Sequence, residues 1–218
     1  MITRYGYDVF FTVTIICIAA LLLSLWLIEP KLIRYGVVLL SALLLALTIN
    51  FFRDPERTAP VGDTLVLSPA DGKIIAIRTV TQKEYLDSEA TLISIFMSPL
   101  NVHVNRNPIG GMVGHLRYVE GEFFAAYEDK ASEKNEQMVI GIEGPRGRVL
   151  FKQIAGFVAR RIVCTLKVGD SVRAGERFGM IKFGSRVDLY VPQRATIRAK
   201  VGDVTTAGET VLAELHQP

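Results

Sequence analysis

Two long apolar runs open the chain and are followed by a more polar remainder. Residues Val9–Ile28 carry no charge, and a second uncharged run covers Tyr35–Phe52. At a rise of about 1.5 Å per residue, each run is long enough to cross the hydrocarbon core of a bilayer. Pro30 lies between the runs and interrupts helical hydrogen bonding. The pattern predicts two transmembrane or membrane-associated helices, joined as an anchoring hairpin over residues 1–52.

Two other interpretations of these runs are considered. A cleaved signal peptide fits the first run less well, because Arg4 is the only early basic residue and no small-residue cleavage site precedes Glu29. Two helices buried in a soluble core would show the same hydropathy. The second run and the turn at Pro30 favour the membrane hairpin.

Basic residues around the runs favour one orientation. The arginines at the outer ends are Arg4, Arg53 and Arg57, and the basic residues of the connecting loop are Lys31 and Arg34. Loops rich in positive residues stay on the cytoplasmic side of a membrane. We therefore expect a cell-membrane protein whose residues 53–218 lie on the cytoplasmic side. The two cysteines, Cys17 and Cys164, do not predict a disulfide, because the first lies within an apolar run.

Residues 53–218 show the short apolar or alternating runs that are typical of strands. The runs are Leu65–Leu67, Lys73–Ile77, Thr91–Phe96, Met138–Ile142 and Arg148–Phe151. Helical periodicity is limited to Phe123–Tyr127, and the polar stretch Glu128–Gln137 is a candidate flap beside a site. The pattern predicts a mainly β domain.

An internal repeat refines this prediction. The nine residues Val168–Glu176 recur as Val201–Glu209, and in both units a Gly-Asp pair indicates a tight turn. Two such units are typical of the pseudo-symmetric barrel-sandwich of lipoyl and biotinyl carrier domains, although two unrelated hairpins would read alike. The modified lysine of a carrier is missing from the tip at Ile181–Ser185, and Gly184-Ser185 stands there instead.

Charge limits the possible partners. The formal net charge is +3, and no long basic run is present. Nucleic-acid binding needs a clustered basic face, so no nucleic-acid partner is expected. A small basic excess beside a membrane anchor fits anionic lipid headgroups better.

The pair Gly184-Ser185 suggests a backbone that cuts itself. The Ser185 hydroxyl can attack the Gly184 carbonyl and turn the amide into an ester, and elimination from that ester would leave a pyruvoyl group. Glycine suits the acyl side because it has no Cβ to block the attack. The dipeptide is common, so its significance depends on its neighbours.

Four segments, in this order and spacing, resemble the phosphatidylserine decarboxylase proenzyme family, in its short form with an N-terminal membrane hairpin. They are Phe51–Arg57, Ser68–Lys73, Met97–Arg106 and Phe183–Ser185. Each motif is weak alone, whereas the four together are specific. The resemblance covers essentially the whole chain.

The resemblance implies a zymogen that cleaves itself between Gly184 and Ser185. The products would be a large chain, 1–184, and a small chain, 185–218, that begins with a pyruvoyl cofactor made from Ser185 and stays with the large chain as a heterodimer. The catalytic domain, 53–218, would be a pyruvoyl-dependent carboxy-lyase. Through a Schiff base to the pyruvoyl ketone, it would convert the membrane lipid phosphatidylserine to phosphatidylethanolamine and CO₂.

The resemblance also suggests catalytic residues. Asp71 matches an aspartate that the family links to self-cleavage, although Asp-Gly is also an ordinary turn. His103 matches the first histidine of the family's Ser-Pro-x-x-x-His segment. Many longer members carry a second histidine three residues later, where this chain has Arg106, which cannot act as a base. Either His103 serves both steps or another group activates Ser185.

Two further assignments stay open. Arg160 and Arg161 can bind the phosphodiester of the lipid or pair structurally with acidic residues. No metal site is expected. A serine phospholipid with ether-linked chains would present the same headgroup as phosphatidylserine. A non-enzymatic membrane adaptor with a lipoyl-like sandwich is the alternative from another functional class.

Overall fold

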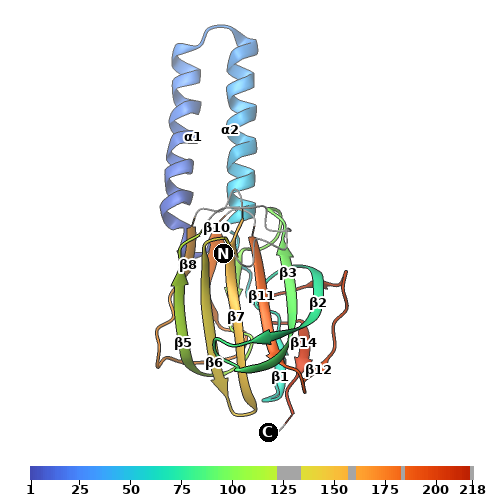
Figure 1. The fold of residues 1–218 in the computed structure, drawn as a ribbon. Helices are drawn as coiled ribbons and strands as arrows, with labels where there is room; N and C mark the ends of the chain where they lie inside the picture. The colour runs from blue at the N-terminus through green and yellow to red at the C-terminus, as the bar shows by residue number, and fades with distance from the viewer. Residues whose placement is uncertain (122–133, 157–160, 183–184, 217–218) are drawn as a thin grey trace. The chain divides into compact units, whose positions relative to one another are not determined.

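The computed structural model describes residues 1–121, 134–156, 161–182 and 185–216. The chain forms two compact units, Met1–Glu56 and Arg57–Pro218. The expected helical segment Phe123–Tyr127 and residues 128–133 of the expected flap lie outside the described residues. Figure 1 shows two helices in the first unit and strands throughout the second.

The first unit is a helical hairpin. A 3-10 turn, Arg4–Gly6, leads into α1 (Tyr7–Leu27), and α2 (Lys31–Phe51) follows after a short turn. Pro30 is the N-cap of α2, where its missing N–H costs no helical hydrogen bond.

Backbone hydrogen bonds tie the N-terminus of the first unit to the end of α2. The Thr3 N–H donates to the Phe52 carbonyl at 2.9 Å, and the Asp54 N–H donates to the Met1 carbonyl at 2.7 Å. A Cβ on Gly6 would lie only 2.0 Å from the Phe52 ring. Glycine at position 6 therefore lets the two ends of the hairpin pack closely.

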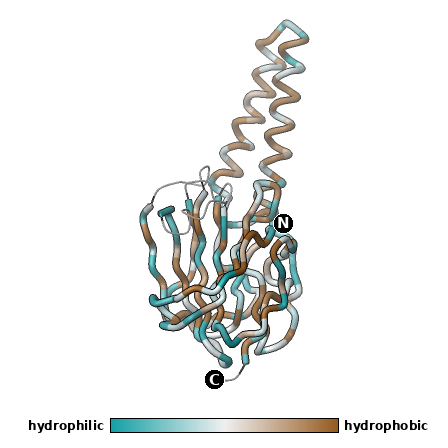
Figure 2. Tube along the Cα trace, turned by 45° about the vertical axis from the view of Figure 1, so that its right-hand side comes forward, coloured by the Kyte–Doolittle hydropathy of each residue, from teal (hydrophilic) through white to brown (hydrophobic). Residues whose placement is uncertain are grey.

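The surface of the helical hairpin is apolar. Both helices are long and apolar enough to span a bilayer, and few of their side chains are buried. Trp26 is 83% exposed and Leu39 is 72% exposed. Figure 2 shows hydrophobic residues along most of both helices. Apolar faces of this size are unfavourable in water, so they are consistent with membrane association. The prediction of two apolar helices is confirmed.

The second unit consists of strands in three sheets. Its strands are β1 (Leu65–Leu67), β2 (Gly72–Gln82), β3 (Ser88–Met97), β4 (Val104–Arg106), β5 (Gly111–Val119), β6 (Gln137–Gly144), β7 (Gly147–Ala155), β8 (Arg161–Cys164), β9 (Ser171–Val172), β10 (Arg177–Lys182), β11 (Ser185–Pro192), β12 (Thr196–Ile197), β13 (Val204–Thr205) and β14 (Val211–Glu214). All five predicted strand runs lie within strands, so the mainly β class is confirmed.

The largest sheet is curled and has the order β13-β2-β3-β11-β7-β6-β5-β9 (Figure 1). Two three-stranded sheets, β4-β10-β8 and β1-β14-β12, complete the sandwich. The neighbouring strands are antiparallel, as the register of each printed pair shows. Strand β11 lies near the middle of the large sheet and is paired on both sides.

The alternation of side chains along the strands gives the large sheet an inner and an outer face. On β11, Val187 and Leu189 belong to the main core cluster, which also holds Ile95 of β3 and Phe151 of β7. Tyr190 follows Leu189 and therefore points to the opposite face, where it packs in a second cluster. The inner face is therefore the one that carries odd-numbered residues in β3, β7 and β11.

The two repeat units make equivalent backbone contacts. The Gly169 N–H donates to the Val113 carbonyl, and the Gly202 N–H donates to the Ile74 carbonyl, both at 2.8 Å. Each first glycine has a positive φ, of 91° and 99° respectively. In each turn the aspartate, Asp170 or Asp203, accepts a backbone N–H from three residues earlier at 2.8 Å. The repeat in the sequence is thus a repeat of turn geometry.

The second glycines of the two units meet each other. A Cβ on Gly208 would lie 3.2 Å from the Gly175 Cα and 2.7 Å from the Arg106 Cδ. Both glycines have positive φ, 77° at Gly175 and 76° at Gly208. A side chain at either position would meet both backbone strain and a steric obstacle.

This contact predicts different costs for two alanine substitutions. Gly208→Ala should lower the free energy of unfolding by about 2–4 kcal/mol, because strain at positive φ and crowding add up. Gly202→Ala should cost only about 1–2 kcal/mol, because the space around Gly202 is open within 4 Å. Thermal unfolding of the detergent-solubilised protein measures both. Equal shifts in the midpoint would contradict the crowding at Gly208.

Candidate active site

Ser185 lies on the inner face of the large sheet at the first position of β11. It is fully buried and opposes Met97 of β3 and Ala155 of β7. Its hydroxyl donates to the Met97 sulfur at 3.2 Å. A thioether is a weak acceptor, so this contact leaves the hydroxyl able to turn toward a stronger one.

The chain changes sheets immediately before Ser185. Strand β10 ends at Lys182 and pairs with β4 and β8, whereas β11 pairs with β3 and β7. The sequence predicted this segment as a hairpin tip. That detail was wrong, because β10 and β11 do not pair with each other. Gly184 itself lies outside the described residues.

His103 is brought close to the segment that leads to Ser185. Its side chain is fully buried, and its backbone carbonyl accepts the Ile181 N–H at 3.4 Å. The Nδ1 atom lies 3.0 Å from the Asn101 carbonyl oxygen. A carbonyl oxygen can only accept, so Nδ1 carries the proton in this contact and Nε2 is the basic nitrogen.

Asp71 lies at the same end of the large sheet, directly before β2. Its two carboxylate oxygens accept from Arg57 at 2.5 and 2.8 Å. One of them also accepts the Ala207 N–H at 2.8 Å. These contacts hold Asp71 in a nearly buried ion pair that joins the linker after α2 to the second repeat unit. The sequence analysis used Arg57 as a basic residue beside the apolar runs and as part of a motif, but it did not predict this pairing with Asp71.

Arg106, at the position where longer family members carry a histidine, has a structural contact. It is 4% exposed, and its guanidinium donates to the Gly175 carbonyl at 2.9 Å. The side chain therefore holds the point where the two repeat units meet.

Two buried amide side chains near Ser185 were missed by the sequence analysis. Asn105 of β4 and Gln153 of β7 are both fully buried, and the Gln153 Nε2 donates to the Asn105 Oδ1 at 2.9 Å. Gln153 lies between Phe151 and Ala155, which both belong to the main core. The sequence signal that could have revealed Gln153 is a polar residue in phase with the inward-facing apolar positions of its strand.

The two candidate phosphate-binding arginines are only partly placed. Arg160 lies outside the described residues. Arg161 begins β8, is exposed, and opposes Lys182 of β10. Its position is therefore next to the strand end that leads into Ser185.

A buried ion pair lies on the other face of β11. The Arg186 Nε donates to Asp188 at 2.6 Å, and its Nη2 donates to the Ser94 hydroxyl at 2.7 Å. Arg186 is 1% exposed, and Asp188 and Ser94 are fully buried. These bonds fix the start of β11 from the outer face.

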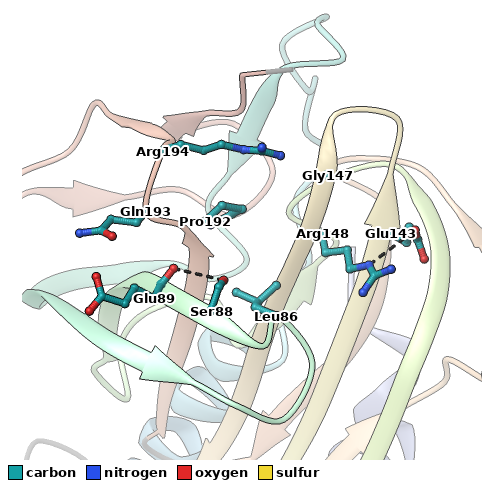
Figure 3. A pocket seen from close by; sticks show the side chains of 9 residues that line it. All are labelled: Leu86, Ser88, Glu89, Glu143, Gly147, Arg148, Pro192, Gln193 and Arg194. Atoms are coloured by element: carbon teal, nitrogen blue, oxygen red, sulfur yellow. Dashed lines mark hydrogen bonds and ion pairs between the residues drawn. The ribbon is translucent and has the colours of Figure 1, made fainter. Parts of the chain in front are cut away.

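An open cleft of about 740 Å³ lies elsewhere on the described part of the chain. Figure 3 shows Arg148 and Glu143 on one side, and Pro192 and Arg194 on the other. Pro192 ends β11, so this cleft is roughly 23 Å from Ser185 along the strand, at about 3.3 Å per residue. We do not assign the chemistry of Ser185 to it.

Comparisons with known proteins agree with the four motifs. The family model described as phosphatidylserine decarboxylase matches residues 44–213. A phosphatidylserine decarboxylase proenzyme of Prosthecochloris aestuarii is 48% identical over 216 residues, which cover 99% of this chain and 98% of that protein. Proenzymes of the same name from Pelodictyon phaeoclathratiforme and Chlorobaculum tepidum are each 46% identical, over 98% of this chain and 99% and 97% of their own lengths.

The ion pair at Asp71 predicts a stability effect. Arg57→Ala should lower the free energy of unfolding by about 1–3 kcal/mol, because it leaves a nearly buried carboxylate without its charged partner. As a control, Arg146→Ala removes a largely solvent-accessible pair with Asp63, in which the arginine is partly exposed and the aspartate is exposed, and should cost less than about 1 kcal/mol. Thermal unfolding compares them, and an equal loss in both variants would contradict this structural role.

Proposed function

The chain belongs to the phosphatidylserine decarboxylase family, and from this we propose that it is a proenzyme that converts phosphatidylserine to phosphatidylethanolamine and CO₂. The observation that carries the proposal is the near-full-length similarity to proenzymes of that name. The similarity also sets aside the reading as a non-enzymatic adaptor, because the family is one of decarboxylases.

We propose that maturation is a self-cleavage between Gly184 and Ser185. The Ser185 Oγ attacks the Gly184 carbonyl carbon, and the amide nitrogen leaves as the ester forms. Loss of the Ser185 Hα then releases Gly184 as a carboxylate and leaves an N-terminal dehydroalanine. Hydrolysis of its imine tautomer consumes one water, releases ammonia and gives the pyruvoyl group. The weak hydroxyl contact to Met97 supports this, because it leaves the nucleophile available.

The surroundings of Ser185 fit a pyruvoyl group. The site is buried and apolar on the side of Met97 and Ala155, and the Gln153 amide lies on the same inner face. A pyruvoyl ketone supplies an electron sink for the electron pair that CO₂ leaves behind. Burial limits the access of bulk water, so the proton that replaces CO₂ would come from a placed side chain.

His103 is our candidate for moving protons in both steps. An imidazole has a pKa suited to accepting the Ser185 hydroxyl proton and later to donating one to the substrate carbon. Its Nδ1 contact with the Asn101 carbonyl fixes the ring, with Nε2 as the basic nitrogen. We assign Asp71 an indirect role, through the turn that it holds with Ala207.

The remaining partners follow from the lipid substrate. We propose that Arg160 and Arg161 bind its phosphodiester and that the apolar hairpin anchors the protein in the cell membrane, with the catalytic unit on the cytoplasmic side. The small chain 185–218 contains β11 to β14, of which β11, β13 and β14 pair with strands of the large chain. This pairing supports a heterodimer that persists after cleavage.

Ser185→Ala should give a single uncut and inactive chain, because alanine has no nucleophile for the attack on Gly184. The purified wild-type protein should show two fragments on a denaturing gel, the smaller without a free N-terminal amine. Ser171→Ala, which changes an exposed serine of β9, should mature normally. Intact mass decides the comparison, and full decarboxylase activity in uncut Ser185→Ala would refute the mechanism.

His103→Ala should slow the formation of the two fragments by at least about 100-fold and leave little activity in the protein that matures, because acid–base catalysis is lost. Arg106→Ala should lower the thermal unfolding midpoint but allow cleavage, because a permanent cation is no base. A time course on denaturing gels measures both. Full processing of His103→Ala with none of Arg106→Ala would reverse the two assignments.

A further inference from the structure

Gln153 lies on the same face of the sheet as Ser185 and one step along the neighbouring strand. Ser185 opposes Ala155, and Gln153 precedes Ala155 by two residues on β7. Diagonal neighbours of this kind have Cα atoms about 7–8 Å apart, within reach of a long side chain. The Gln153 side chain therefore shares the buried space inside the sheet with the position that becomes the pyruvoyl group.

Hydrogen bonds connect Gln153 to the surroundings of Ser185. The Gln153 Nε2 donates to the Asn105 Oδ1 at 2.9 Å and lies 3.4 Å from the Val163 carbonyl oxygen. The Asn105 Nδ2 in turn donates to the Pro69 carbonyl at 3.3 Å and lies 3.9 Å from the Met97 sulfur. The same sulfur accepts the Ser185 hydroxyl. The two amides and the serine thus form one connected group.

The acceptors at both ends of this group fix the orientation of the two amides. The Pro69 and Val163 carbonyls can only accept, so each must face an NH₂ group. If either amide were flipped, its oxygen would face a carbonyl oxygen or the other amide's oxygen. The orientation leaves the Gln153 Oε1 as a pure acceptor with a fixed direction.

This oxygen has no hydrogen-bond partner among the described residues, although it is fully buried. A buried acceptor without a donor costs about 1–3 kcal/mol. Its partner NH₂ is fully engaged, so the side chain cannot turn to relieve this cost. Such an acceptor is suited to a donor that arrives with a ligand.

We propose that the Gln153 Oε1 binds the amino group of the serine headgroup as it reaches the carbonyl carbon derived from Ser185. The proposal rests on the proposed decarboxylase function. The free amine that attacks the ketone carries two N–H donors and one lone pair, so an N–H can pair with the lone buried acceptor while the lone pair faces the carbonyl carbon. The hydrogen bond aims the amine at the carbonyl and selects headgroups that carry a primary amine over those with a fully methylated nitrogen.

Gln137 is a matched control within the same sheet. It is 5% exposed, and its Oε1 is also buried without a partner among the described residues. On β6 it opposes Ile154, and its neighbour Met138 packs against the main core. Because side chains alternate, Gln137 lies on the outer face, opposite to Ser185.

The test uses the full-length, self-cleaved protein in detergent with phosphatidylethanolamine and sodium cyanoborohydride. The amine joins the ketone with loss of water, and hydride from the reagent makes the bond permanent. The mass of the small fragment then reports both pyruvoyl content and trapped amine, without any decarboxylation. Gln153→Met, Gln153→Glu and Gln137→Met are compared with the wild type.

We expect Gln153→Met to form the pyruvoyl fragment normally, to trap amine about 10- to 100-fold more slowly, and to show a raised KM for phosphatidylserine, because the hydrogen bond that aims the amine at the ketone is lost. Gln137→Met should behave as the wild type. Protonated Gln153→Glu keeps a donor to Asn105 and a free acceptor, so at low pH it should trap within about threefold of the wild type.

Other outcomes overturn the proposal or its premise. Wild-type trapping in Gln153→Met, or an equal loss in Gln137→Met, would show that Gln153 has no specific role toward the amine. Failure of Gln153→Met to self-cleave would place Gln153 in maturation instead. If Gln153→Met does not fold, Gln153→Glu decides the matter alone. The proposal is then overturned if the ratio of the Gln153→Glu trapping rate to the wild-type rate stays constant across pH, because ionisation of the glutamate would have no effect on the amine. No trapping in the wild type would instead refute the proposed function.

Discussion

Hydrogen bonding of β11 on both sides is the constraint on which the rest of the structure depends. The strand pairs with β3 from Ser185 to Pro192 and with β7 from Ser185 to Tyr190. A cut before Ser185 removes one covalent link and leaves these bonds in place. Strand β13 adds to the edge of the same sheet, and β14 lies between β1 and β12. The strands of the small fragment would therefore stay hydrogen-bonded within two of the three sheets, and no new contact would have to form to hold the two fragments together.

The register of β11 decides which way Ser185 points. A slip by one residue would turn Ser185 to the outer face and place Arg186 in the apolar core. The ion pair of Arg186 with Asp188, and its bond to Ser94, make that slip very costly, because a buried charge would lose its partners. A charged group on one face thus holds the nucleophile on the other.

Buried polar groups gather at the same end of the sandwich as Ser185. His103, Asn105 and Gln153 are all fully buried, whereas the inward positions farther along β11 are valine and leucine. Each buried polar atom needs a partner or lowers stability. Departures from the apolar pattern are expected where a protein does chemistry, and here they lie around one serine.

The sequence by itself determined the features that depend on neighbouring residues. Apolar runs of bilayer length gave α1 and α2, alternating runs gave five strands, and Gly-Asp pairs gave the two equivalent turns. The pair Gly184-Ser185 marked the candidate cleavage site together with three other motifs. These signals are local, because helix length and turn geometry are set by residues that are adjacent in the chain.

Only the tertiary structure decided which distant residues meet. The sequence did not show that β10 and β11 belong to different sheets, that Arg57 holds Asp71, or that Gln153 reaches Asn105 across 48 positions. Strand pairing and buried hydrogen bonds join segments that are far apart, and one apolar alternation is compatible with many partners. The physical reason is that a strand pattern specifies a buried face, whereas its neighbours are chosen by the packing of the whole domain.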